Sequence, residues 1–205
     1  LVAAGADVIT DDIFYFAEPF FQDGVIAQAA DQAVANGVAY YTSAGNSSDN
    51  SYEATYSNSG QTNTFTNNNN VSVTGTLHDF DAGVGVDTTQ SLTFQAGGSF
   101  TLGFQWDNPF SSVSASSGGA IEDYDILLTD NTGAIIANLS ASSSTIGGDP
   151  VEIFQIANNG ESAVQANLSI VRTNQGAEAT DNFIKYVLYR SGGVAVNEFD
   201  TQSST

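Results

Sequence analysis

The stretch Phe-Thr-Leu-Gly-Phe-Gln-Trp at residues 100–106 places a large apolar side chain at every second position. Successive side chains of an extended strand point to opposite faces, so this period of two predicts a strand with one buried face. Residues 164–170 repeat the pattern with Val, Ala, Leu and Ile. Shorter alternating runs follow the same rule at residues 92–94, 124–128, 135–139, 151–153 and 183–189. The sequence therefore predicts a mainly β protein.

Turn signals rich in Gly, Asn and Asp separate these runs at residues 96–98, 130–133, 158–160 and 174–176. About eight short strands separated by such turn signals are typical of an antiparallel β-sandwich. We therefore expect a jelly-roll-like antiparallel β-sandwich over residues 71–195, with a return linker over residues 196–205. Residues 51–70 are dense in Asn, Ser, Thr and Gly, and we expect a polar linker there.

The first 50 residues follow a different pattern. Residues 6–16 are apolar and strand-like, apart from Asp11 and Asp12. Apolar residues then recur at helical spacing over 25–34, with Asp23 as the expected N-cap and Gly37 as the expected stop. A second apolar strand begins at Val38. This order predicts a partial α/β segment over residues 1–50 with a parallel strand pair, whose partner strands must come from elsewhere.

The charge balance restricts the partners of the chain. The 205 residues include 23 acidic and three basic residues, a formal net charge of -20. Such a negative field repels phosphate backbones and anionic membranes, so we expect no nucleic-acid or membrane partner. The chain has no cysteine and no methionine, which excludes disulfides and fits a secreted, bacterial protein. Carboxylates also suit calcium, which is the candidate cofactor.

Two stretches of the N-terminal segment resemble a known family. "GADVITDDI" at residues 5–13 and "QAADQAVANGVAYYTSAGN" at residues 28–46 occur in the order strand, helix, strand. They resemble the subtilisin-like serine peptidases, in which such a unit carries the substrate-pocket strand and then the oxyanion-hole Asn. The string 43–46, Ser-Ala-Gly-Asn, is the most specific part of the match. The rest of the chain is similar to β-sandwich domains that accompany secreted bacterial peptidases.

The resemblance implies roles for particular residues. Asn46 would donate its side-chain amide to the tetrahedral intermediate. The substrate channel would be lined by Asp11, Asp12, Ile13, Ser43, Ala44 and Gly45. The ligand would be a polypeptide substrate, and the β-sandwich would shape access to the channel or dock a protein substrate.

Other parts of a peptidase site are missing from the chain. The family needs Asp, His and Ser in characteristic strings, and none of these strings occurs. The single histidine, His78, lies outside the β–α–β unit, and we expect an ordinary surface or strand-edge histidine. The sequence therefore indicates an internal fragment of a serine endopeptidase, with the fragment itself inactive.

Two alternatives remain open from the sequence. The row that ends at Trp106 would stack on sugars if it were exposed, in a non-catalytic module for carbohydrate or cell surface; its regular alternation favours a buried face. The second alternative is a calcium-stabilised structural spacer of an exported protein. Its candidate calcium ligands are Asp79, Asp81, Asp107, Glu122, Asp123 and Asp125.

Overall fold

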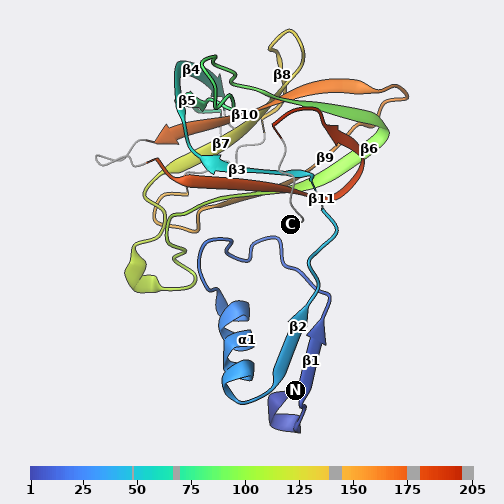
Figure 1. Ribbon diagram of the computed structural model, residues 1–205. Helices are drawn as coiled ribbons and strands as arrows, with labels where there is room; N and C mark the ends of the chain where they lie inside the picture. The colour runs from blue at the N-terminus through green and yellow to red at the C-terminus, as the bar shows by residue number, and fades with distance from the viewer. Residues whose placement is uncertain (48, 67–69, 139–144, 175–180, 200–205) are drawn as a thin grey trace.

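The computed structural model of the chain describes residues 1–47, 49–66, 70–138, 145–174 and 181–199. A small β–α–β unit lies at the N-terminus, and a larger antiparallel β body follows it (Figure 1). The predicted mainly β fold with a large antiparallel sheet is therefore confirmed.

The body, as far as its residues are described, is a nine-stranded sheet in which β6 is the central strand. Along residues 99–105, β6 pairs with β9 and with β11, and along residues 90–94 it pairs with β10 and β11. β10 pairs in turn with β5 and β7. The strands are β3 (Ser51–Thr55), β4 (Asn58–Thr66), β5 (Ser72–His78), β6 (Gln90–Trp106), β7 (Asp123–Thr129), β8 (Ile135–Asn138), β9 (Val151–Ala157), β10 (Val164–Asn174) and β11 (Phe183–Val196).

The turn predicted at residues 96–98 is a bend inside β6 rather than a loop between two strands. Gly97 has a φ of 72°, a left-handed conformation that glycine adopts without steric cost. At Gly98, an added Cβ would lie 2.4 Å from the carbonyl oxygen of Gly193 on β11. Because these positions lack side chains, the two strands approach closely and β6 continues from one half of the sheet into the other.

The bend in β6 divides the sheet into two halves, one built on residues 90–94 of β6 and the other on residues 99–106. The hydrophobic core lies between these halves. Alternate residues of β6, β7, β10 and β11 form one buried cluster. The predicted row of Phe100, Leu102, Phe104 and Trp106 is at most 1% exposed, which confirms that this face is buried. The Trp106 ring packs against Tyr124, with 5.2 Å between the ring centroids. Trp106 is therefore inaccessible to a sugar.

The predicted polar linker is wrong for residues 51–66, which form β3 and β4. β3 pairs with β11, and β4 pairs with β5. Three aromatic side chains anchor this otherwise polar stretch: Tyr52, Tyr56 and Phe65 are buried. Each aromatic ring buries a large apolar area, so a few of them offset a polar composition. Residues 67–69 of the predicted linker lie outside the described residues.

The predicted return linker over residues 196–205 packs against the sheet as far as Phe199. The Ser91 amide donates to Glu198 Oε1 at 2.9 Å. The Phe199 ring stacks on Phe80, with centroids 6.1 Å apart. Residues 200–205 lie outside the described residues.

The N-terminal unit contains β1 (Val8–Asp11), α1 (Val25–Ala35) and β2 (Ala39–Thr42). β1 and β2 pair in parallel, with Val8 opposite Ala39, so the predicted strand pair is present. The helix is capped by Gly24 rather than by the predicted Asp23. A side chain at Gly24 would lie 2.8 Å from Pro19 Cδ, so Pro19 packs directly on the start of the helix.

The segment between β1 and α1 docks this unit on the outer face of the body. Gln105 of β6 is buried, and its two amide atoms hold the segment's backbone: Phe20 N donates to Oε1, and Nε2 donates to Glu18 O, both at 2.8 Å. Phe14 stacks on Tyr189 of β11, with ring centroids 5.1 Å apart. These contacts fix the ends of β1 and β2 beside β11.

Much of the apolar surface of the N-terminal unit faces solvent. Ala33 is the only buried residue of α1, all of which the structure describes. A two-stranded sheet is marginal on its own, because it leaves edges and faces uncovered. The exposed large apolar side chains of the unit include Val8, Ile13, Phe14, Tyr15, Val25, Val34 and Tyr41.

Candidate functional site

Two adjoining hollows lie where β1 and β2 end against β11. The first, of about 240 Å³, is lined by Ile13, Phe14, Glu18, residues 42–47 and Tyr189. The second, of about 250 Å³, is lined by Phe14, Asn46, Ser47, Asn50, Leu188, Arg190 and Ser191. They share Phe14, Asn46 and Ser47, so they form one groove, which we call the strand-end cleft.

The cleft brings together most of the residues that the resemblance assigned to a substrate channel. β1 and β2 run in the same direction, so the segments that follow them leave the sheet at one edge. The predicted residues that line the cleft are Ile13, Ser43, Ala44, Gly45 and Asn46. Asp11 and Asp12 are not among the described lining residues.

Asn46 is exposed and lines both halves of the cleft. Gly45 before it has a φ of 82°, a left-handed turn that takes the chain out of the β2 direction. No protein hydrogen bond of the Asn46 side chain is found within the described ranges. Its carboxamide is therefore available to donate to a ligand oxygen.

Asp11 ties the two strands of the N-terminal unit together. Tyr40 Oη donates to Asp11 Oδ2, and Thr42 Oγ1 donates to Oδ1 at 2.5 Å. The hydrogen bond from Thr42 lowers the pKa of the Asp11 carboxyl most, and the one from Tyr40 lowers it further. The bond to Asp11 is also the main cause of a raised pKa of Tyr40. Asp11 is thus a cross-strand clamp, whereas its neighbour Asp12 is exposed.

His78 is 1% exposed, so the expected surface or strand-edge histidine is instead a core residue. The Ser57 amide donates to Nδ1 at 3.0 Å, which places the proton on Nε2, 2.8 Å from Tyr52 Oη. Burial lowers the pKa of His78 to about 4. A buried, neutral histidine with both nitrogens engaged is not available as a general base.

The buried state of His78 predicts a specific acid sensitivity. Its folded pKa of about 4 lies below the ordinary 6.5, so the unfolded chain binds more protons between these values. Stability should therefore fall as the pH falls through this window. Between pH 7 and 4.5 the wild type should lose roughly 2–3 kcal/mol more unfolding free energy than a His78→Gln variant. Urea denaturation at both pH values measures this difference, and equal losses in the two proteins would contradict the assignment.

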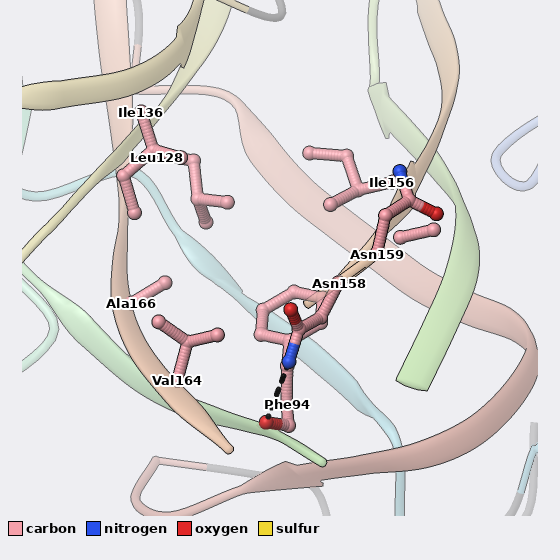
Figure 2. A pocket seen from close by; sticks show the side chains of 9 residues that line it. Phe94, Leu128, Ile136, Ile156, Asn158, Asn159, Val164 and Ala166 are labelled. Atoms are coloured by element: carbon pink, nitrogen blue, oxygen red, sulfur yellow. Dashed lines mark hydrogen bonds between the residues drawn. The ribbon is translucent and has the colours of Figure 1, made fainter. Parts of the chain in front are cut away.

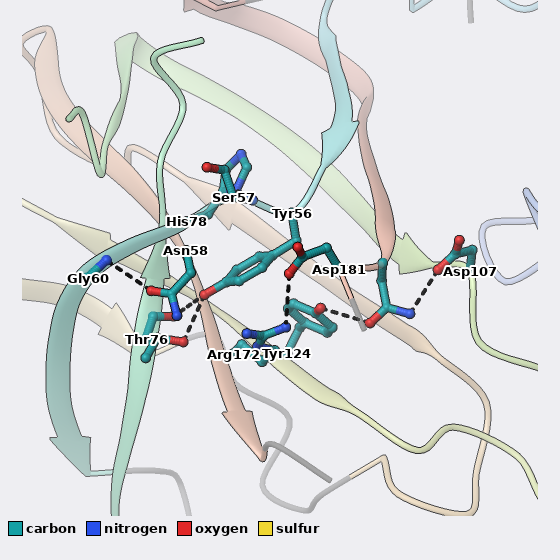
Figure 3. A network of polar contacts seen from close by, with 11 residues as sticks. Tyr56, Ser57, Asn58, Gly60, Thr76, His78, Asp107, Tyr124, Arg172 and Asp181 are labelled. Atoms are coloured by element: carbon teal, nitrogen blue, oxygen red, sulfur yellow. Dashed lines mark hydrogen bonds and ion pairs between the residues drawn. The ribbon is translucent and has the colours of Figure 1, made fainter. Parts of the chain in front are cut away.

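A polar network, buried at Arg172 and exposed at Asp181, surrounds Arg172 of β10 (Figure 3). Its guanidinium carbon lies 4.4 Å from the centre of the Tyr56 ring, and Nη1 lies 3.7 Å from Asp181 Oδ1. Tyr124 Oη donates to Asn182 Oδ1 at 2.9 Å. The network joins residues at or beside the ends of β3, β7, β10 and β11, and we assign it to stabilising the body.

The acidic residues predicted as calcium ligands are spread over the body. Asp79 Oδ1 accepts from the amides of Asp81 and Asp87 at 3.1 and 2.9 Å. Asp123 Oδ1 accepts from both the amide and the hydroxyl of Thr145. In the part of the chain that the structure describes, no group of three or more potential metal ligands converges. The carboxylates of Asp79 and Asp123 thus act as loop hydrogen-bond acceptors.

A second cavity, of about 150 Å³, opens between β6, β7, β9 and β10 (Figure 2). Its polar lining residues are Asn158 and Asn159, and Asn158 Nδ2 already donates to backbone oxygens of Gln95 and Ser162. No titratable side chain is among its described lining residues, so it offers no acid–base chemistry. The apolar lining residues are Phe94, Leu128, Ile136, Ile156, Ala157, Val164 and Ala166.

Sequence reasoning missed the wall of the strand-end cleft that β11 supplies. This wall consists of residues 188–191, which are far from Asn46 along the chain. They meet Asn46 only because the N-terminal unit docks on β11. One signal was available: Arg190 is one of only three basic residues in the chain.

No protein-family model matches the sequence, and no curated protein matches it either. Among the described residues, no helix is long and apolar enough to cross a membrane. The strand-end cleft is therefore the feature of the chain that indicates a function.

Proposed function

We propose that the chain is part of a secreted, subtilisin-like serine endopeptidase whose polypeptide substrate lies along the strand-end cleft. The observation that carries the proposal is the position of Asn46. Its carboxamide is exposed, follows the second strand of a parallel pair, and lines a cleft. A donor held in this way can stabilise an oxyanion as it develops, which is the largest single contribution in many acyl-transfer reactions.

In this proposal the rest of the catalytic machinery comes from the larger protein. Serine peptidases need a nucleophile and a base within hydrogen-bond reach of each other. His78 is buried and held by Ser57 and Tyr52, so it is not the base. The exposed edges and faces of the N-terminal unit would be covered by further strands and helices of the same catalytic domain.

We assign the body the role of a jelly-roll-like β-sandwich insertion that shapes access to the substrate channel. Support comes from β11, which contributes Tyr189 and Arg190 to the cleft wall. The buried amide of Gln105 and the stacked pair of Phe14 and Tyr189 hold this wall against the N-terminal unit. A rigid wall beside the oxyanion donor restricts which polypeptides reach it.

The proposal predicts that the isolated 205-residue chain is proteolytically inactive. It should show no hydrolysis of casein and no labelling by a serine-directed fluorophosphonate, because its single histidine is buried and the family's Ser string does not occur in the sequence. Intact subtilisin, run in parallel, should be labelled and active. Labelling of the isolated chain at a serine would show that the chain holds a nucleophile of its own and would overturn this assignment.

The coding sequence on either side of this segment is the direct test of the family. The proposal expects Asp and His strings upstream and a Ser string downstream in one reading frame. A frame that encodes neither would end the peptidase proposal. The remaining candidates would then be a binding module or a structural spacer, and the burial of Trp106 argues against sugar stacking by that residue.

A further inference from the structure

The strand-end cleft contains a cation in an unusual backbone conformation. Arg190 has a φ of 51°, in the left-handed region that residues other than glycine seldom adopt. It lies in the bulge of β11, where the pairing with β6 shifts register between Tyr189 and Gly192. A bulge redirects side chains from the regular strand pattern, and strained residues of this kind concentrate at functional sites. Here the bulge places Arg190 in the wall of the cleft.

The guanidinium of Arg190 is held by an aromatic ring rather than by a carboxylate. Its central carbon lies 5.2 Å from the centre of the Phe16 ring. The two ion pairs found among the described residues involve the other basic residues, Arg172 and Lys185. Stacking on a ring leaves the N–H groups at the edge of the guanidinium free to donate in their own plane. In a chain with 23 acidic residues, a cation without a carboxylate partner in the described ranges is informative.

The surroundings of Arg190 suit one negatively charged group. Of the described residues that line this half of the cleft, Arg190 is the only charged one. Asn46 and Asn50 add amide groups, and the buried Oγ of the neighbouring Ser191 has no hydrogen-bond partner within the described ranges. The carboxylate of Glu18 lines the other half. The cleft therefore has a positive end and a negative end, with Asn46 common to both.

We propose that the Arg190 end of the cleft binds a carboxylate, and that its ligand is a polypeptide with an acidic side chain beside the Asn46 position. A planar guanidinium matches a carboxylate through two parallel hydrogen bonds. The net charge of -20 repels anions at long range, but screening at physiological salt confines that field to about 8 Å. Recognition is then decided by the groups in the cleft. The choice of a peptide as ligand rests on the proposed function.

The test is a binding titration of the isotopically labelled chain at about 0.15 M salt. Two acetylated, amidated pentapeptides serve as probes, Ala-Ala-Glu-Ala-Ala and its Gln counterpart, with the amides of Asn46 and Ser191 as NMR reporters. The Glu peptide should bind about three- to fivefold more tightly, which is the upper part of the range that a partly exposed ion pair contributes. Equal affinity of the two peptides, or no shift of these amides at millimolar peptide, would overturn the proposal.

Three variants assign the preference to Arg190. Arg190→Asn removes the charge while Asn tolerates a left-handed backbone, so the fold should persist and the preference should disappear. Arg190→Lys should retain part of the preference. Lys185→Gln is the matched control, because it removes one positive charge from the same strand and should keep the preference. Loss of the preference in Lys185→Gln as well, or its survival in Arg190→Asn, would refute the site.

The outcomes separate this inference from the peptidase proposal. Binding is measured without catalysis, so a carboxylate preference stands even where the flanking coding sequence lacks the catalytic strings. Conversely, catalytic strings together with equal binding of the two peptides would reject the Arg190 site alone.

Discussion

Replacing Asn46 with alanine should lower kcat of the proposed complete peptidase about 10²–10³-fold while KM changes little. This range is the established loss for an oxyanion-hole Asn of the subtilisin family itself, and the resemblance carries it over to Asn46. The expected pattern follows from the chemistry: the amide would bind charge that develops in the transition state and is small in the bound substrate. Steady-state kinetics on a chromogenic peptide measures both constants.

Asn50→Ala is the matched control for this experiment. Asn50 lines the same cleft and carries the same functional group, but it lies beyond the turn that exposes Asn46. Its loss should leave kcat nearly unchanged. Asn46 is exposed, so its replacement should also alter the free energy of unfolding by only about 0.5 kcal/mol or less. An Asn46→Ala enzyme with a raised KM and an unchanged kcat would place this residue in ground-state binding instead.

Phe104→Ala should lower the free energy of unfolding of the chain by about 3–5 kcal/mol. Phe104 is 0% exposed and packs against both Trp106 and Tyr124 in the core. Removing the ring loses its transfer free energy and leaves a cavity that the surrounding strands fill only in part. Domains of this size are stable by about 5–15 kcal/mol, so the loss is a large fraction of the total. Urea denaturation followed by tryptophan fluorescence measures it.

Ile153→Ala on the adjacent β9 is the control for Phe104→Ala. Ile153 pairs with Gly103 in the same part of the sheet, but 41% of it is exposed. Its truncation should cost less than about 1.5 kcal/mol, because only part of the side chain is buried and no closed cavity forms. Similar losses for the two variants would mean that Phe104 is not in the main core.

The strands with strict alternation were predictable, and those with a few aromatic anchors were not. The sequence of residues 100–106 indicates a buried face, because every second side chain is large and apolar. Residues 51–66 carry only a few aromatic rings among polar residues, and local composition favoured a linker. β3 is a strand because it pairs with β11, which is distant in sequence. β4 is a strand because it pairs with β5, which the sequence did not indicate as a strand. Tertiary pairing of this kind leaves little trace in a single sequence.

The candidate site divides in the same way. The strand-end position of Asn46 follows from consecutive residues and a short crossover, so local sequence was enough to predict it. The opposite wall, with Tyr189 and Arg190, depends on how the segment after β1 docks on β11. That docking uses Gln105, a polar residue on the outward side of an alternating strand, where a solvent-facing side chain was the natural expectation.

The continuous path of β6 through the bent sheet has a consequence for how the body can be inherited or engineered. β6 supplies hydrogen bonds to β9, β10 and β11, so the same strand is the central strand of both halves of the sheet. A cut inside β6 would therefore remove the central strand from both halves of the sheet. Neither half should then fold as a shorter independent module. A transplant into another host protein must carry residues 51–199 as one unit, because Glu198 and Phe199 also pack against the sheet.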